Sequence, residues 1–139
     1  MLKKINPILS PEMLSTLREM GHGDKLAIVD GNYPAKADAG RLIRADGLDL
    51  IPVLDAVLDI LPIDKTSDAI VRAVNAVSPD QPDPIHERII ETCLKYGQQV
   101  TPLEPDLFYA RVRSSFSIIA TSERALYANV ILTKGVIMP

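Results

Sequence analysis

Short apolar runs alternate along this chain with segments whose apolar residues recur at helical spacing, and this alternation limits the possible folds. The run from Lys25 to Val29 ends at Asp30 and is followed by the turn sequence Gly31-Asn32-Tyr33-Pro34. An apolar run of this length, bounded by turn residues, is typical of a buried strand. The same pattern predicts further strands over residues 41–44, 68–77, 116–121 and 127–132.

Helices are predicted between these strands. The first helix is predicted to start at Ser10-Pro11-Glu12. The Ser10 hydroxyl caps the first turn, and proline suits the first helical position. The Glu12 carboxylate lies near the positive end of the helix dipole. Gly21 ends this helix. Further helices are predicted over residues 50–61, 85–94 and 105–112, and the proline-rich segment 78–84 is predicted to be a surface loop.

Helices and buried strands that alternate throughout indicate an α/β fold with helices covering a largely buried sheet. The 139 residues, of which 47% are hydrophobic, suit one packed core. We therefore predict a single domain over residues 1–139.

The composition excludes several function classes. The net charge is −3, Lys and Arg are scattered, and aromatic residues make up 4% with no Trp, so neither a phosphate-binding track nor a base-stacking platform is expected. The N-terminal residues lack a signal-peptide pattern, and no run approaches the roughly 18 apolar residues of a membrane span. We expect a cytoplasmic protein that binds neither nucleic acid nor membrane.

The single cysteine, Cys93, permits no intramolecular disulfide and is interpreted as a buried helix residue.

The two histidines are the first candidates for acid–base chemistry, because imidazole titrates near neutrality. His86 follows the proline-rich segment among charged residues, and we interpret it as solvated surface. His22 lies between Gly21 and Gly23, which allow a sharp turn and the close approach of a ligand. In the alternative interpretation, Gly21 merely ends the helix and His22 has no role.

Three polar residues accompany His22 as candidates. Asp30 follows a predicted strand, where α/β sheets place ligand-binding residues, although a local Asx-turn is equally consistent with it. Tyr127 and Asn129 are two residues apart, so in a strand both would lie on one face, either toward a ligand or toward solvent. No phosphate-binding loop, no metal-ligand spacing and no nucleophile elbow is present. The sequence therefore predicts a hydroxyl-binding, proton-transferring pocket without cofactor or metal.

A set of short motifs, densest at both ends of the chain, carries a family resemblance. These motifs are Met1-Leu2-Lys3-Lys4-Ile5-Asn6-Pro7, Met20-Gly21-His22-Gly23-Asp24, Asp30, Ile43-Arg44-Ala45-Asp46-Gly47, Phe108-Tyr109, Ser122-Glu123-Arg124, Tyr127-Ala128-Asn129 and Thr133-Lys134-Gly135-Val136. With them the chain resembles the RbsD/FucU family over nearly its whole length. The opening helix with Arg44-Ala45-Asp46-Gly47 is closer to the fucose mutarotase branch than to the ribose pyranase branch.

This resemblance implies helix–sheet–helix layers and an isomerase that interconverts the anomers of a free monosaccharide such as L-fucose, within carbohydrate metabolism. It also implies ring-shaped homo-oligomers, typically homodecamers, with sugar sites near subunit contacts and no cofactor. By motif match, His22 takes the position of the proton donor, and the sugar-binding positions fall on Asp30, Tyr127, Ala128 and Asn129.

Two regions depart from the family pattern. Pro105 stands where the fucose branch has arginine and the ribose branch has histidine, so a basic sugar contact is missing, and only Glu104, Arg111 and Arg113 lie near enough in sequence to replace it. Segment 63–99 also matches poorly. The alternatives to a fucose-type mutarotase are therefore a D-ribose pyranase-type enzyme and a non-catalytic sugar-binding protein.

Overall fold

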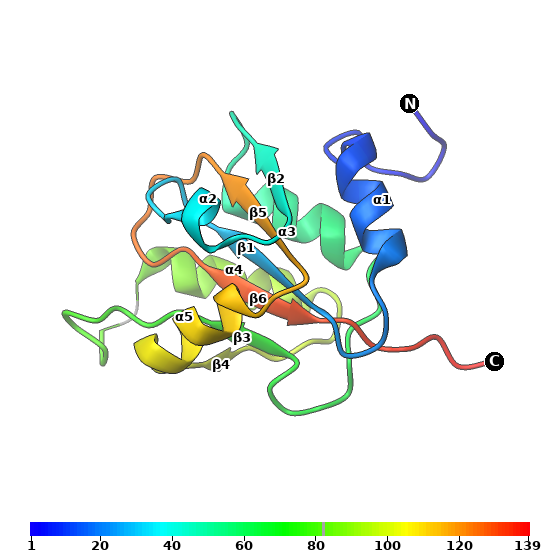
Figure 1. The fold of residues 1–139 in the computed structure, drawn as a ribbon. Helices are drawn as coiled ribbons and strands as arrows, with labels where there is room; N and C mark the ends of the chain where they lie inside the picture. Colours follow the sequence, from blue (N-terminus) through cyan, green and yellow to red (C-terminus); the bar gives the residue numbers. More distant parts are fainter. Residues whose placement is uncertain (82) are drawn as a thin grey trace.

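A central sheet with helices on both faces forms the protein, as a computed structural model of residues 1–81 and 83–139 shows (Figure 1). The helices are α1 (Pro11–Glu19), α2 (Ala35–Asp38), α3 (Leu50–Leu58), α4 (Pro84–Leu94) and α5 (Pro105–Arg113). The strands are β1 (Lys25–Val29), β2 (Leu42–Ala45), β3 (Ile70–Arg72), β4 (Thr101–Pro102), β5 (Ser117–Thr121) and β6 (Val130–Thr133).

The sheet has six strands in the order β2-β5-β1-β6-β3-β4 and is mixed. Strand β5 is parallel to β1 and β2, and β3 is parallel to β4, whereas β6 runs antiparallel to both of its neighbours. Because Ile28 lies opposite Val130 in this register, the residues that follow β1 lie beside those that precede β6. This register brings Asp30 next to Asn129 although 99 residues separate them in the sequence.

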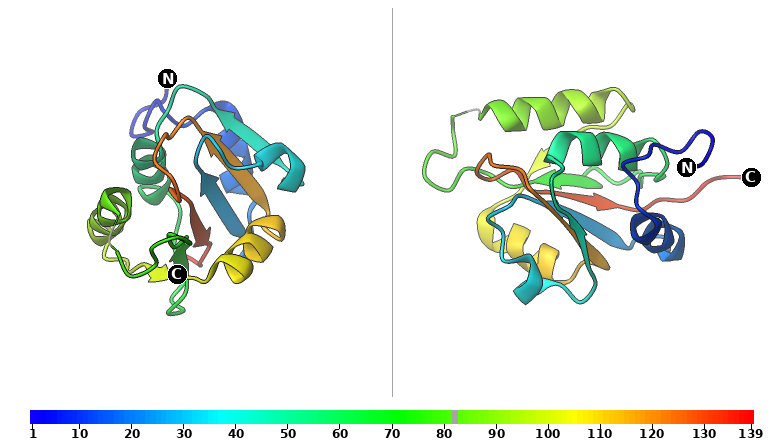
Figure 2. Two further views of the ribbon diagram at one scale, coloured as in Figure 1. Left: turned by 90° about the vertical axis from the view of Figure 1, so that its left-hand side faces the viewer. Right: turned by 90° about the horizontal axis from the view of Figure 1, so that it is seen from above.

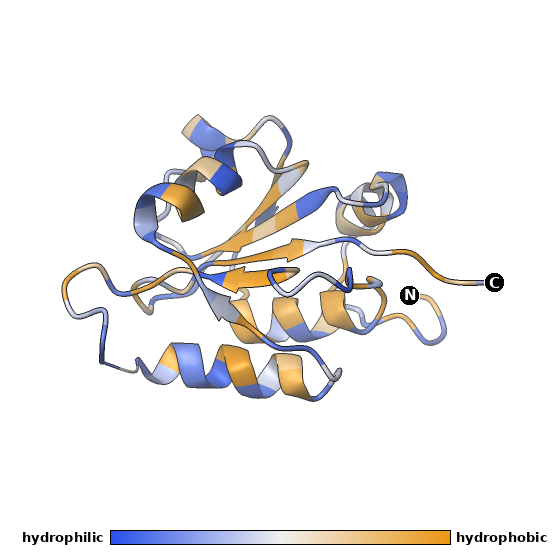
Figure 3. Cartoon of the chain, turned by 90° about the horizontal axis from the view of Figure 1, so that it is seen from below, coloured by the Kyte–Doolittle hydropathy of each residue, from blue (hydrophilic) through white to orange (hydrophobic). Residues whose placement is uncertain are grey.

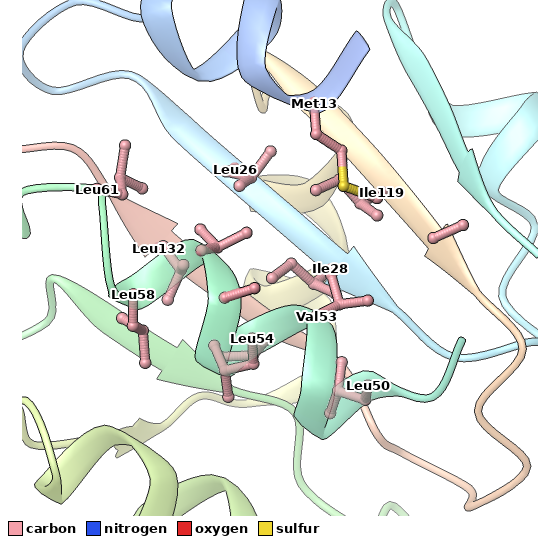
Figure 4. Packing of buried hydrophobic residues seen from close by; sticks show 14 of the residues in the cluster. Met13, Leu26, Ile28, Leu50, Val53, Leu54, Leu58, Leu61, Ile119 and Leu132 are labelled. Carbon is pink, nitrogen blue, oxygen red and sulfur yellow. The ribbon is translucent and has the colours of Figure 1, made fainter. Parts of the chain in front are cut away.

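Alternate residues of the central strands face opposite helix layers, as the two-residue period of a strand requires. On β1, Leu26 and Ile28 join the core that α1, α3 and α4 cover, whereas Ala27 and Val29 join the core under α2 and α5. Figure 2 shows α3 and α4 on one side of the sheet and α2 and α5 on the other. Figure 4 shows Met13 of α1 and the leucines of α3 packed around β1 and β6. The predicted helix–sheet–helix α/β fold is confirmed.

Helix α3 carries hydrophobic residues on nearly all of its faces (Figure 3), because it packs against both the sheet and α4. Cys93 of α4 is fully buried in the same core, as predicted, and burial raises the pKa of its thiol to about 12. No helix of the described residues has the length and apolar character needed to cross a membrane.

The predicted elements and the structure differ in several places. The strand predicted over residues 68–77 covers only Ile70–Arg72, because Asn75 starts a turn in which its side chain accepts the backbone N–H groups of Val77 and Ser78. The proline-rich loop ends where α4 begins at Pro84, and Pro82 lies outside the described residues. The short elements α2 and β4 were not predicted, because four and two residues are too few to show a period.

The strand predicted over residues 127–132 begins only at Val130. Tyr127 has a φ of 58°, in the left-handed region, which is incompatible with a strand. The prediction that Tyr127 and Asn129 share a strand face is therefore wrong, and both residues belong to the loop that leads into β6.

Candidate active site

A cavity of about 500 Å³ opens at the end of the sheet where β1 stops and β6 starts. Its volume falls within the range of small-molecule sites, about 300–1,000 Å³. Strand ends and loops supply most of the lining, and α2 and α5 supply the rest. The lining residues are Asp30, Asn32, Tyr33, Pro34, Asp38, Tyr109, Arg113, Leu126, Tyr127 and Asn129.

Asp30 and Asn129 form the buried floor of this cavity, with only 5% and 3% of their surfaces exposed. Asn129 Nδ2 donates to Asp30 Oδ2 at 3.1 Å, and Asn129 Oδ1 accepts the backbone N–H of Asp30 at 2.8 Å. Burial raises the pKa of Asp30, and hydrogen bonds from Asn32, Asn129, Tyr33 and Ala128 act in the opposite direction. The carboxylate is thus a fixed acceptor facing the cavity.

The Asx-turn that was the alternative interpretation of Asp30 is also present. Asp30 Oδ1 accepts the backbone N–H of Asn32 at 2.9 Å, while Oδ2 accepts from Asn129. The Asx-turn and a role in the cavity are therefore compatible, because the turn orients the Asp30 carboxylate toward the cavity.

Tyr127 and Asn129 both line the cavity although they share no strand. Between them Ala128 is completely buried in the apolar core, and its backbone N–H lowers the pKa of the nearby Asp30 carboxylate. The left-handed φ of Tyr127 turns the chain so that its own side chain and that of Asn129 reach the cavity while the methyl group of Ala128 does not.

Sequence reasoning missed a second set of cavity residues, Tyr33, Asp38 and Tyr109. Tyr33 Oη donates to Asp38 Oδ2 at 2.8 Å, and its ring lies 6.0 Å from that of Tyr109. Burial and Asp38 together raise the pKa of Tyr33. The position of Tyr33 three residues after Asp30 was the one available signal, whereas Tyr109 reaches the cavity only through the packing of α5.

Arg113 of α5 is the one positively charged residue among the described residues that line the cavity. Pro105 begins α5 as its first residue, so it has a helical role, and Glu104 occupies the N-cap position. Arg111 donates to Asp68 at 3.3 Å and does not line the cavity. Of the three candidates for the missing basic contact, the structure brings Arg113 alone to this place.

His22 lies at the opposite end of β1 from Asp30. It precedes β1, whose five residues span about 16 Å, and Asp30 follows the same strand. Its side chain is 59% exposed, with Nε2 3.2 Å from Asp64 Oδ1, and this contact lowers the pKa of Asp64. The structure of one chain therefore does not bring His22 together with Asp30, Tyr127 and Asn129.

A second cavity, of about 620 Å³, adjoins His22. Apolar side chains from α1, from the residues that follow α3 and from those that follow β6 form most of its wall. The lining residues are Leu14, Leu17, Arg18, His22, Ile60, Leu61, Pro62, Lys134, Gly135, Val136 and Ile137.

His86 is buried, with 3% of its surface exposed, so the prediction of a solvated surface residue is wrong. It lies in the first turn of α4 and faces the sheet, where Arg72 of β3 and the backbone carbonyl of Tyr127 contact its ring. The charged neighbours in the sequence, Glu87 and Arg88, are exposed instead. In the part of the chain that the structure describes, no three His, Cys, Asp or Glu side chains gather closely enough to hold a metal ion.

Comparison with known proteins extends these observations over the whole chain. The family model described as the RbsD / FucU transport protein family matches residues 3–137. L-fucose mutarotase from Haemophilus influenzae (strain 86-028NP) is 38% identical over 140 residues, which cover 98% of this chain and 97% of that protein. L-fucose mutarotase from Actinobacillus pleuropneumoniae serotype 5b (strain L20) is 36% identical with the same coverage.

Two solved structures share the fold. The fucose mutarotase from Streptococcus pneumoniae in complex with L-fucose superposes with a TM-score of 0.92 at 38% identity, covering 99% of this chain and 100% of that chain. RbsD from Bacillus subtilis complexed with D-ribose superposes with a TM-score of 0.79 at 21% identity, covering the same shares.

Proposed function

Because this chain belongs to the RbsD/FucU family, we propose that it is an isomerase, a monosaccharide mutarotase with L-fucose or a closely similar sugar as its substrate. The observation that carries the proposal is the buried Asp30–Asn129 pair at the floor of a cavity of monosaccharide scale. The full-length similarity to L-fucose mutarotases and to a fucose mutarotase structure with bound L-fucose supports the choice of sugar.

The cavity offers the groups that a polyhydroxylated ring needs. The Asp30 carboxylate accepts hydrogen bonds from sugar hydroxyls, and Asn129 holds that carboxylate in place. Tyr127 and Tyr109 line the cavity; aromatic rings suit the C–H surfaces of a sugar ring, and phenols donate or accept hydrogen bonds. Arg113 supplies the basic contact that Pro105 lacks.

Mutarotation opens and recloses the hemiacetal. The anomeric hydroxyl loses its proton while the ring oxygen gains one, the bond between C1 and the ring oxygen breaks, and an open-chain aldehyde results. Rotation about the C1–C2 bond and reclosure on the other face of the carbonyl return both protons, so that nothing is gained or lost. We assign His22 as the group that protonates the ring oxygen, a role for which imidazole is suited near neutral pH.

His22 and Asp30 lie at opposite ends of β1 within one chain, so a site that contains both residues requires two chains. We propose that His22 of a neighbouring copy completes the cavity around Asp30, in a ring-shaped homodecamer in the cytoplasm, as the family resemblance implies. His22 is exposed beside an apolar cavity, and the nearby Val136, Ile137 and Met138 are exposed as well. An exposed apolar area of this kind is typical of a contact with another protein surface.

Exchange NMR with a panel of free monosaccharides tests the function. We expect magnetisation transfer between the α- and β-pyranose signals of L-fucose at catalytic amounts of protein. Exchange that includes furanose signals, strongest with D-ribose, would indicate the pyranase-type alternative. Line broadening without accelerated exchange would indicate a non-catalytic sugar-binding protein, the alternative that Pro105 favours, and would overturn the mutarotase proposal.

A further inference from the structure

His86 lies behind the cavity and bonds the backbone of the loop that lines it. Its Nε2 is 3.0 Å from the carbonyl oxygen of Tyr127. A carbonyl oxygen can only accept, so Nε2 carries the hydrogen. The imidazole is buried, so this bond is shielded from competition by water.

Arg72 determines the state of the other ring nitrogen. Its Nη1 lies 3.2 Å from His86 Nδ1, and a guanidinium can only donate, so Nδ1 is the acceptor. Asp83 Oδ2 is farther from Nδ1, at 3.7 Å, and accepts from Asn75 instead. His86 is therefore neutral with its hydrogen on Nε2, because a second ring proton would point at the guanidinium.

The peptide unit that His86 contacts, between Tyr127 and Ala128, lies between His86 and the Asp30 carboxylate. The carbonyl of Tyr127 accepts from His86, and the N–H of the same peptide unit, that of Ala128, acts on the Asp30 carboxylate and lowers its pKa. Tyr127 also has a φ of 58°, a conformation that a residue with a side chain keeps only where its surroundings hold it.

We propose that His86, oriented by Arg72, is a positioning residue for the cavity: it holds the peptide between Tyr127 and Ala128 so that the Tyr127 side chain faces the sugar. Its own ring does not line the cavity. This inference rests on the proposed function only in naming the sugar as the ligand; the hydrogen-bonded chain Arg72–His86–Tyr127 stands independently of it.

Two amide variants test the contacts of the two ring nitrogens of His86 separately. In His86→Gln, the longer side chain can place an N–H near the position of Nε2 and keep the bond to Tyr127. In His86→Asn, the shorter side chain reaches only the position of Nδ1, so the contact with Arg72 survives and the bond to Tyr127 is lost. We expect His86→Asn to raise the KM and the Kd for L-fucose about two- to tenfold, the effect of one hydrogen bond, with a smaller change in kcat. His86→Gln should stay close to the wild-type values.

A double-mutant cycle distinguishes positioning from general destabilisation. If His86 acts through Tyr127, His86→Asn should have little further effect on the Kd in a Tyr127→Ala background, because no side chain remains to be positioned. Additive effects of the two substitutions, or equal Kd values for wild type, His86→Gln and His86→Asn, would overturn the proposal.

A spectroscopic measurement tests the protonation of His86 in the wild-type protein. It requires neither an activity assay nor a variant that folds. In ¹⁵N spectra of the imidazole groups at neutral pH, His86 should show one protonated nitrogen, Nε2, and one unprotonated nitrogen, Nδ1, with a scalar coupling from Nε2 to the Tyr127 carbonyl carbon. A protonated Nδ1 would contradict the proposal. If the spectra agree but no sugar shows accelerated exchange, the mutarotase function fails while the positioning of Tyr127 stands.

Discussion

Asn129 and Asp30 are joined by two reciprocal hydrogen bonds across the boundary between β1 and β6, one through the backbone N–H of Asp30 and one through its carboxylate. Both polar ends of the Asn129 side chain are thereby occupied. Motif matching places Asn129 among the sugar contacts, and the geometry adds a second role, because the amide orients the acceptor that faces the sugar. Substitutions at this pair therefore disturb a buried hydrogen-bonded contact at the floor of the cavity.

The isosteric substitution Asn129→Asp should therefore be far more harmful than its size indicates. It replaces the donor to Asp30 Oδ2 by a carboxylate oxygen at the same place, so two negative charges meet in a buried site. We expect a loss of about 1–3 kcal/mol in the free energy of unfolding, measured by urea denaturation, and at least about tenfold lower mutarotation. Asn32→Asp adds the same charge at the exposed side of the cavity without breaking either bond, and a stability loss equal to that of Asn129→Asp would contradict this explanation.

Mixing two inactive variants tests whether the site is shared between chains. His22→Gln removes the proton donor and Asp30→Asn removes the acceptor. If His22 serves the cavity of a neighbouring copy, co-assembly of the two variants in equal amounts restores about a quarter of the sites, because each site draws the two residues from different chains. Exchange NMR before and after dissociation and reassembly measures the recovery. No recovery in mixed assemblies, with both parents inactive, would show that one chain supplies both residues.

Arg113→Gln should weaken sugar binding without changing the fold. Arg113 lines the cavity and lies close enough to Tyr33 to lower the pKa of that phenol, opposing the raising effects of burial and Asp38. We expect a KM about ten- to a hundredfold higher with a smaller effect on kcat, as for the loss of one hydrogen bond from a charged donor. Arg111→Gln is the matched control, because Arg111 pairs with Asp68 outside the cavity. Equal KM values for the two variants would remove Arg113 from the site.

Acid should destabilise the protein through His86. Burial, together with the Arg72 charge, lowers the pKa of His86 in the folded state below its ordinary 6.5. The unfolded chain therefore takes up the proton first, and the stability present above pH 6.5 is lost as the pH falls through 6.5 toward the folded-state pKa. The difference in the free energy of unfolding between wild type and His86→Gln, followed from pH 7.5 to 5, isolates this contribution. A difference that stays constant over this range would show that His86 is not buried in its neutral form.

Local patterns in the sequence account for most of the secondary structure. Ser10 caps α1 by accepting the N–H of Met13, with Pro11 at the first helical position, and the apolar run from Lys25 to Val29 is the central strand. These predictions succeed because caps and periodicity act within a few residues. The strand start at Tyr127 was mispredicted because Tyr127 has a left-handed φ, and the partner of its carbonyl, His86, lies 41 positions away in the sequence.

The sequence by itself determined the fold class, the position of Asp30 at a strand end, and the family to which the chain belongs. Only the tertiary structure decided which polar groups meet. The register between β1 and β6 joins Asp30 to Asn129, and the packing of α4 on the sheet turns His86, in an apparently polar segment, into a buried support for Tyr127. It also places His22 at the far end of β1 from Asp30. The physical reason is that hydrogen bonds between residues 40 to 100 positions apart depend on strand order and helix packing, which local propensity does not encode.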